Sequence, residues 1–124
     1  MQMIQKSKNL VLSDEILNQY HQKLESVIKS KLLYLRPKLC LDDLSIETGI
    51  PLEYVKQVLS EKLNSTFFEF ISKYKIRRAK RLLTKIDDDH FSLSKVAIES
   101  GFNTDESFVA LFKKHTNMSP ENYR

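Results

Sequence analysis

The chain holds only two glycines, three prolines, one cysteine and no tryptophan among its 124 residues. A lone cysteine cannot form an internal disulfide, which excludes a disulfide-stabilised secreted scaffold. No apolar run approaches the roughly 18 residues of a membrane-spanning helix, and the first residues lack the apolar stretch of a signal peptide. We therefore expect a cytoplasmic protein whose segment makes no membrane contact.

The residue types that catalysis or metal binding would require are scattered along the chain. The three histidines, His21, His90 and His115, are far apart, and no metal-ligand spacing joins them to Cys40. The acidic run that starts at Asp87 is not completed into an EF-hand loop. Two dispersed glycines also exclude a glycine-rich phosphate loop. We expect no enzymatic activity, no metal and no cofactor.

Positive charge is concentrated in one part of the chain. The formal net charge is +4 at pH 7. Residues 65–90 hold seven lysines and arginines, whereas residues 41–64 hold five acidic residues against two lysines. This distribution is compatible with a polyanionic partner, although many basic proteins bind none.

Both glycines occupy the same place in a repeated phrase. The stretch LSIETGI at 44–50 recurs 52 residues later as VAIESGF at 96–102. In each copy an apolar-periodic stretch leads into the glycine, and a second one follows after a few residues. Glycine suits such a corner because the residue after a helix often adopts a left-handed conformation. The repeat therefore predicts two helix-turn-helix units.

Capping residues and apolar periodicity predict an all-α fold. Ser13 is placed to cap a helix, and Thr66 lies three residues before Glu69, the spacing of a capping box. Further helix starts are expected at Ser92, Thr104 and Ser119. The predicted organisation is a tail at 1–12, an N-terminal helix at 13–36, a helix-turn-helix subdomain at 37–64, a long linker helix at 65–86 and a second helix-turn-helix subdomain at 87–124.

Several dispersed motifs support a family resemblance: Leu41-Asp42-Asp43-Leu44, Gly49-Ile50, Tyr74-Lys75-Ile76, Ala79-Lys80, Leu82-Leu83, Gly101-Phe102-Asn103, Phe108, Phe112-Lys113-Lys114, Ser119-Pro120 and Tyr123-Arg124. In this order they resemble the DNA-binding domain of the AraC/XylS family of bacterial transcription regulators. The resemblance implies double-stranded DNA as the partner, with the second helices of both units in successive major grooves. It also implies RNA polymerase and an upstream sensor or effector domain as partners.

The resemblance assigns roles to particular side chains. The implied base contacts are Glu53, Lys56 and Gln57 in the first unit and Asn103, Thr104, Glu106 and Val109 in the second. Lysine suits guanine, glutamine suits adenine and glutamate suits the cytosine amino group, whereas Val109 or Ala110 suits a thymine methyl. The implied phosphate contacts are Arg77, Arg78, Lys95, Lys113 and Lys114.

Some positions depart from the family pattern. Cys40 and Pro51 stand where the family usually has side chains that cap helices, and Val109 and Ala110 stand where polar readers are common. We therefore expect the first unit to carry most sequence discrimination. The acidic residues of the second unit motivate an alternative, a helical protein-interaction module with weak or vestigial DNA binding.

Overall fold

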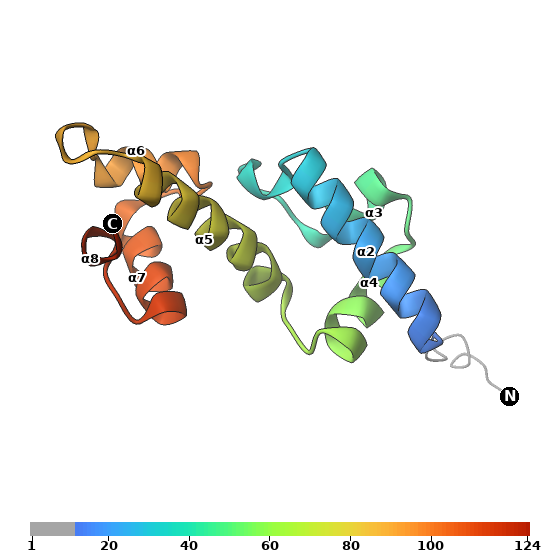
Figure 1. The fold of residues 1–124 in the computed structure, drawn as a ribbon. Coiled ribbons are helices and arrows are strands. Elements are labelled where there is room, and N and C mark those ends of the chain that lie inside the picture. Colours follow the sequence, from blue (N-terminus) through green and yellow to red (C-terminus); the bar gives the residue numbers. More distant parts are fainter. Residues whose placement is uncertain (1–11) are drawn as a thin grey trace, which may run out of the picture. The chain divides into compact units, whose positions relative to one another are not determined.

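The structure, a computed structural model, describes residues 12–124, and every regular element in this range is helical (Figure 1). The all-α prediction is confirmed. Of the predicted tail, residues 1–11 lie outside the described residues. The chain forms two compact units. The first unit contains the described part of 1–31 together with 40–67, and the second contains 32–39 together with 68–124.

The first unit is built from α2 (Asp14–Ser30), α3 (Leu41–Thr48), α4 (Leu52–Gln57) and η2 (Val58–Lys62), a π-helical turn that continues α4. In Figure 1, α2 lies along α3, and it also contacts η2. Leu24 and Ile28 from α2, Leu44 from α3 and Val55 from α4 are fully buried. The additional N-terminal helix therefore forms part of the core of the first helix-turn-helix.

The N-terminal helix ends earlier than the predicted boundary at residue 36. Helix α2 stops at Ser30, and Leu32 has φ of 53°, in the left-handed region that an α-helix cannot continue. A short 3-10 turn, η1 (Leu33–Leu35), follows. Its Tyr34 is buried in the second unit, where its ring stacks on that of Tyr74 at 5.8 Å between centroids. Tertiary packing thus overrides the local helical pattern.

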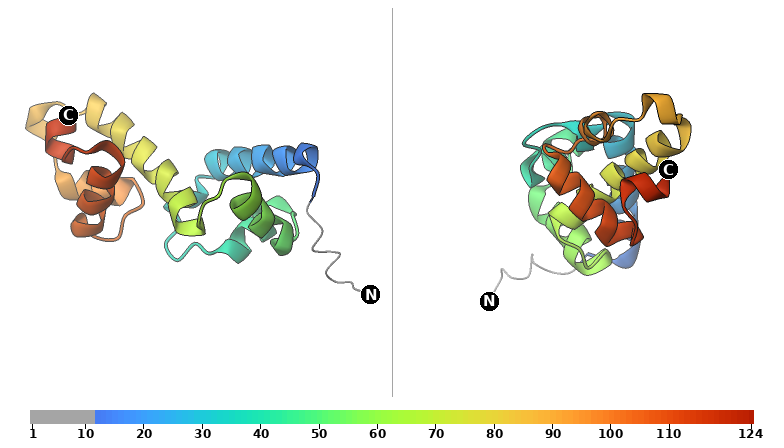
Figure 2. Two further views of the ribbon diagram at one scale, coloured as in Figure 1. Left: turned by 90° about the horizontal axis from the view of Figure 1, so that it is seen from below. Right: turned by 90° about the vertical axis from the view of Figure 1, so that its left-hand side faces the viewer.

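The second unit contains α5 (Phe67–Lys85), η3 (Asp88–His90), α6 (Leu93–Glu99), α7 (Asp105–Thr116) and α8 (Pro120–Tyr123). Figure 2 shows α6, α7 and α8 gathered around the C-terminal half of α5. The core joins apolar side chains of α5, α6, α7 and the turn between α6 and α7: Ile76, Ala79, Leu83, Val96, Ala97, Phe102, Phe108 and Phe112. The long basic helix is therefore a structural part of the second unit.

Four of the five predicted helix N-caps are confirmed in the structure. Side chains accept a backbone N–H three residues on, as N-caps do, at Ser13, Ser92, Thr104 and Ser119. At Cys40, the N-cap of α3, the Asp43 carboxylate accepts the backbone N–H of Cys40 at 2.9 Å, as the third residue of a capping box does. Between α5 and α6 the chain forms the 3-10 turn η3 (Asp88–His90), in which the Asp87 side chain accepts the N–H of His90.

Candidate nucleic-acid interface

The first helix-turn-helix corner, between α3 and α4, is held by its own hydroxyl groups. Gly49 has φ of 77°, as predicted for the corner. The Thr48 hydroxyl donates to the Leu44 carbonyl at 2.6 Å and accepts the Ile50 N–H at 3.2 Å. The Ser45 hydroxyl donates to the Ile50 carbonyl at 2.6 Å. The bonds to Ile50 satisfy backbone groups of the turn, which lie outside the hydrogen-bonding pattern of the helix.

The second corner, between α6 and α7, closes through backbone bonds. Gly101 has φ of 95°, the Phe102 N–H donates to the Ala97 carbonyl at 2.9 Å, and the Gly101 N–H donates to the Ile98 carbonyl at 3.0 Å. This arrangement corresponds to a Schellman-type helix end. Ser100, at the position equivalent to Thr48, is fully buried, and its hydroxyl has no hydrogen-bond partner among the described residues.

The second helix of each helix-turn-helix, α4 in the first and α7 in the second, is its reader helix. The turn between the glycine and the reader helix is one residue longer in the second unit than in the first. The N-cap of α4 is Pro51 and that of α7 is Thr104, so the repeat offset grows from 52 at the glycines to 53 at the caps. In this register Lys56 corresponds to Val109 and Gln57 to Ala110. The second reader therefore has an apolar pair where the first has a polar pair.

On the first reader, Glu53 and Lys56 are exposed. Gln57 is only partly exposed, and its Oε1 accepts the backbone N–H of Leu12 at 3.2 Å. The neighbouring Tyr54 ring stacks on Tyr20 of α2 at 6.0 Å between centroids. Of the three implied base contacts, Glu53 and Lys56 are therefore exposed, whereas Gln57 is hydrogen-bonded to the residue Leu12, which precedes α2. That contact could not be expected from the sequence, because 45 residues separate its partners.

On the second reader, Asn103, Thr104 and Glu106 are exposed and Val109 is half-buried. The Thr104 hydroxyl is occupied by the cap, where it accepts the Ser107 N–H at 3.0 Å. A shallow hollow runs along the exposed side of α7, lined by Asp105, Glu106, Val109, Ala110 and Lys113. The Asp105 carboxylate accepts the Ser94 hydroxyl of α6 at 2.6 Å, which ties together the two helices of this unit.

The implied phosphate contacts occupy two kinds of environment. Lys95, Lys113 and Lys114 are exposed on α6 and α7. Arg77 is exposed on α5, and its guanidinium lies 5.5 Å from the centroid of the Tyr74 ring. Arg78 is half-buried, and its Nε donates to the Glu99 carbonyl at 2.6 Å. The sequence did not indicate that structural bond.

Two basic side chains of the second unit, Lys75 and His115, have lowered pKa values. Desolvation lowers the pKa of Lys75, whose ammonium lies 5.6 Å from the centroid of the Phe102 ring. The pKa of His115 is also lowered, mainly by desolvation and further by the positive charges of Lys114 and Lys80. A nearby phosphate would act on His115 in the opposite direction, since it favours the protonated imidazole.

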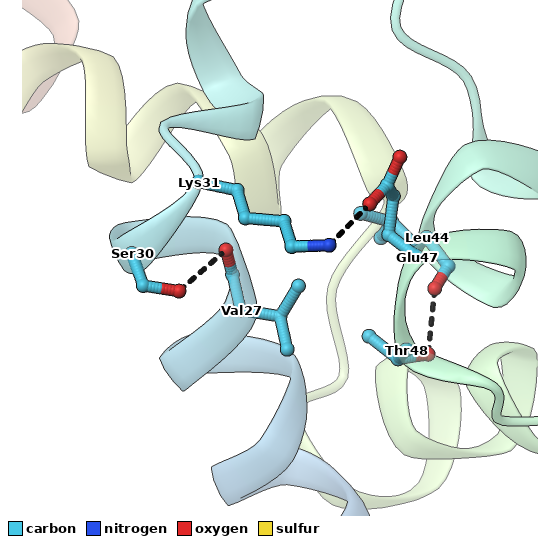
Figure 3. Close-up of polar contacts among 6 residues, drawn as sticks. All are labelled: Val27, Ser30, Lys31, Leu44, Glu47 and Thr48. Atoms are coloured by element: carbon cyan, nitrogen blue, oxygen red, sulfur yellow. Dashed lines mark hydrogen bonds and ion pairs between the residues drawn. The ribbon is translucent and has the colours of Figure 1, made fainter.

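An ion pair that sequence analysis missed joins α2 to the first helix-turn-helix. The Lys31 Nζ lies 2.9 Å from Glu47 Oε1, next to the bond between Thr48 and Leu44 (Figure 3). Such a pair at the surface contributes at most about 1 kcal/mol. It nevertheless fixes the end of α2 beside α3, one residue before the chain enters the second unit.

Within 12–124, no group of three or more His, Cys, Asp or Glu side chains is arranged to hold a metal ion. No helix in the same range is long and apolar enough to cross a membrane.

Comparison with known families places the chain in one of them. The helix-turn-helix domain family, of the AraC type, matches residues 44–124, which include both corners and both reader helices. The chain belongs to this family, and the resemblance predicted from its motifs is confirmed.

Individual relatives are more distant. The chain is 28% identical over 118 residues to an uncharacterised HTH-type transcriptional regulator of Staphylococcus aureus strain COL, covering 95% of the chain but 14% of that protein. An uncharacterised HTH-type transcriptional regulator of Pseudoalteromonas carrageenovora is 26% identical over 102 residues, covering 79% of the chain and 58% of that protein. The chain thus spans about one seventh of the length of the staphylococcal relative.

A solved structure shares the fold. It is the crystal structure of a DNA-binding transcriptional dual regulator from Escherichia coli K-12, with a TM-score of 0.70 and 19% sequence identity. The alignment covers 84% of this chain and 93% of that one.

Proposed function

We propose that this chain is a sequence-specific double-stranded DNA-binding domain of a bacterial transcription regulator. The observation that carries the proposal is the duplicated helix-turn-helix, each copy with a reader helix whose outer side chains are free of the core. Glu53 and Lys56 on α4 and Glu106 and Lys113 on α7 are exposed. Membership of the helix-turn-helix family and the regulator names of the relatives support the same function.

In the proposed mechanism the two reader helices have different roles. Helices α4 and α7 would enter successive major grooves of one duplex. They belong to the predicted subdomains 37–64 and 87–124, which the helix at 65–86 joins. The first reader would supply directional hydrogen bonds from Glu53 and Lys56 to base edges. Gln57 would take part only if its bond to Leu12 opens. The second reader would offer Val109 and Ala110 as an apolar surface.

Duplex binding measured over a range of salt concentrations tests this proposal. Selection from a random duplex pool should yield a site with two elements about one helical turn apart, and affinity should fall steeply as salt rises. Lys56→Ala should relax preference at one base position by about 1–3 kcal/mol. Lys113→Ala should weaken all duplexes alike and reduce the salt slope by about 1. Salt-independent or negligible binding by the wild-type chain would refute the proposal.

The second candidate function is a protein-interaction module. The hollow along α7 favours it, because an apolar pair flanked by Asp105 and Glu106 is a poor match for phosphates. This alternative function predicts that Lys113→Ala leaves duplex affinity unchanged. RNA polymerase and an upstream sensor or effector domain remain proposed partners of the complete protein.

A further inference from the structure

We infer that Arg78 is a positioning residue for the second reader, α7, and not the phosphate contact that the family resemblance implies; the inference rests on the DNA-binding function proposed above. Arg78 lies on α5, is half-buried, and donates its Nε–H to the Glu99 carbonyl at 2.6 Å. Glu99 is the last residue of α6, where carbonyls lack intrahelical partners. A guanidinium supplies that partner, and its charge suits the negative end of a helix.

The segment 32–39 is a second support of the same corner. A Cβ placed on Gly101 would lie 2.8 Å from the Tyr34 carbonyl oxygen and 3.5 Å from the Leu35 Cα. The backbone of this segment therefore lies directly against the glycine. The Tyr34 ring stacks on Tyr74 of α5, one helical turn before Arg78. Both supports of the corner thus depend on neighbouring turns of α5.

The consequence for DNA recognition follows from the shortness of the corner. Only the residues between Glu99 and Asp105 connect α6 to α7. A shift of the Glu99 carbonyl therefore changes the direction in which α7 leaves the turn. A displacement of α7 by about 1 Å would weaken its apolar contact with a base, since a gap of about 0.5–1 Å already forfeits about a quarter to a half of the attraction between two atoms. Arg78 would then control the preference of the second reader without contacting DNA.

The variant Arg78→Lys separates the two roles. Lysine keeps the positive charge, so a phosphate contact would survive the change. It places a methylene group where arginine has Nε, so the donor to the Glu99 carbonyl is lost. Arg78→Ala removes both charge and donor. Arg81→Lys makes the same exchange on an exposed side chain of the next turn of α5 and is the matched control.

Hydrogen exchange in the free 124-residue chain tests the positioning role without DNA. The amides of Ser100, Gly101 and Phe102 close the corner through backbone bonds. In Arg78→Lys they should exchange about tenfold faster, the effect expected for losing one hydrogen bond to a charged group. Arg81→Lys should leave them unchanged. If these amides exchange at the wild-type rate in Arg78→Lys, the inference is overturned, independently of any result on DNA binding.

Duplex binding tests the consequence for recognition. Both Arg78 variants should lose about tenfold in affinity for the selected site. Arg78→Lys should keep wild-type affinity for a duplex with a scrambled second element, which also shows that the first unit is folded. Wild-type preference in Arg78→Lys, combined with a reduced salt slope in Arg78→Ala, would instead assign Arg78 to a phosphate. If the wild-type chain binds no duplex while the exchange result holds, the proposed function fails and the structural role stands.

Discussion

The two helix-turn-helix corners share a glycine in the left-handed region but are stabilised in different ways. The first corner is closed locally, because Ser45 and Thr48 hydroxyls bond to backbone groups within five residues. The second corner is supported by residues distant in sequence, the Arg78 guanidinium and the Tyr34 backbone. A repeat that is nearly uniform in sequence can therefore differ in how strongly each corner depends on the rest of its unit.

The largest predicted difference concerns the glycines themselves. Gly101→Ala should destabilise the chain by about 3 kcal/mol, because the new Cβ is strained at φ of 95° and meets the Tyr34 carbonyl at 2.8 Å. Gly49→Ala should cost only about 1–2 kcal/mol, since a Cβ there meets nothing within 4 Å and only the left-handed strain remains. Urea denaturation of both variants measures the difference. Equal losses would mean that the segment 32–39 does not press against the second corner.

The hydroxyls at equivalent corner positions give the next largest contrast. Thr48→Val preserves shape but removes a donor to the Leu44 carbonyl and an acceptor for the Ile50 N–H, at a cost of about 1–3 kcal/mol. Ser100→Ala removes a buried hydroxyl that has no partner among the described residues, and it should stabilise the chain by about 1 kcal/mol, because burying an unpaired hydroxyl costs free energy. The same denaturation experiment measures both. A substantial loss in Ser100→Ala would reveal a bond at that hydroxyl and weaken the contrast between the corners.

The sequence was sufficient for features whose cause is local. Helix starts at Ser13, Ser92, Thr104 and Ser119 follow from side-chain capping within three residues, and the left-handed glycines follow from the geometry of a helix end. These features locate both reader helices. The register between the two reader helices needed the structure, because the glycines repeat with an offset of 52 whereas the helix N-caps, Pro51 and Thr104, repeat with an offset of 53.

Features caused by contacts between distant residues could not be predicted. The end of α2 at Ser30 depends on the burial of Tyr34 against α5, about 40 residues later in the chain. The bond from Arg78 to the Glu99 carbonyl and the bond from Leu12 to Gln57 span 21 and 45 residues. None of these leaves a periodic or capping signal. For the candidate site, the sequence therefore predicted exposed readers but not which basic and amide side chains the fold already uses.

The smallest predicted effect sharpens the comparison between the readers. Val109 and Ala110 of α7 replace Lys56 and Gln57 of α4, so the second reader should recognise a thymine methyl by contact alone. Replacing that thymine by deoxyuridine should weaken wild-type binding by about 0.8 kcal/mol, the value of one buried methylene-sized group. The loss should shrink in Val109→Thr, which keeps the side-chain shape but replaces a methyl by a hydroxyl.

Titrating both proteins against both duplexes forms a double-mutant cycle, and equal losses of binding free energy in the two proteins would place the thymine methyl against some other side chain. The same base change in the first element should have little effect, because Glu53 and Lys56 are proposed to read hydrogen-bonding groups, which uracil retains.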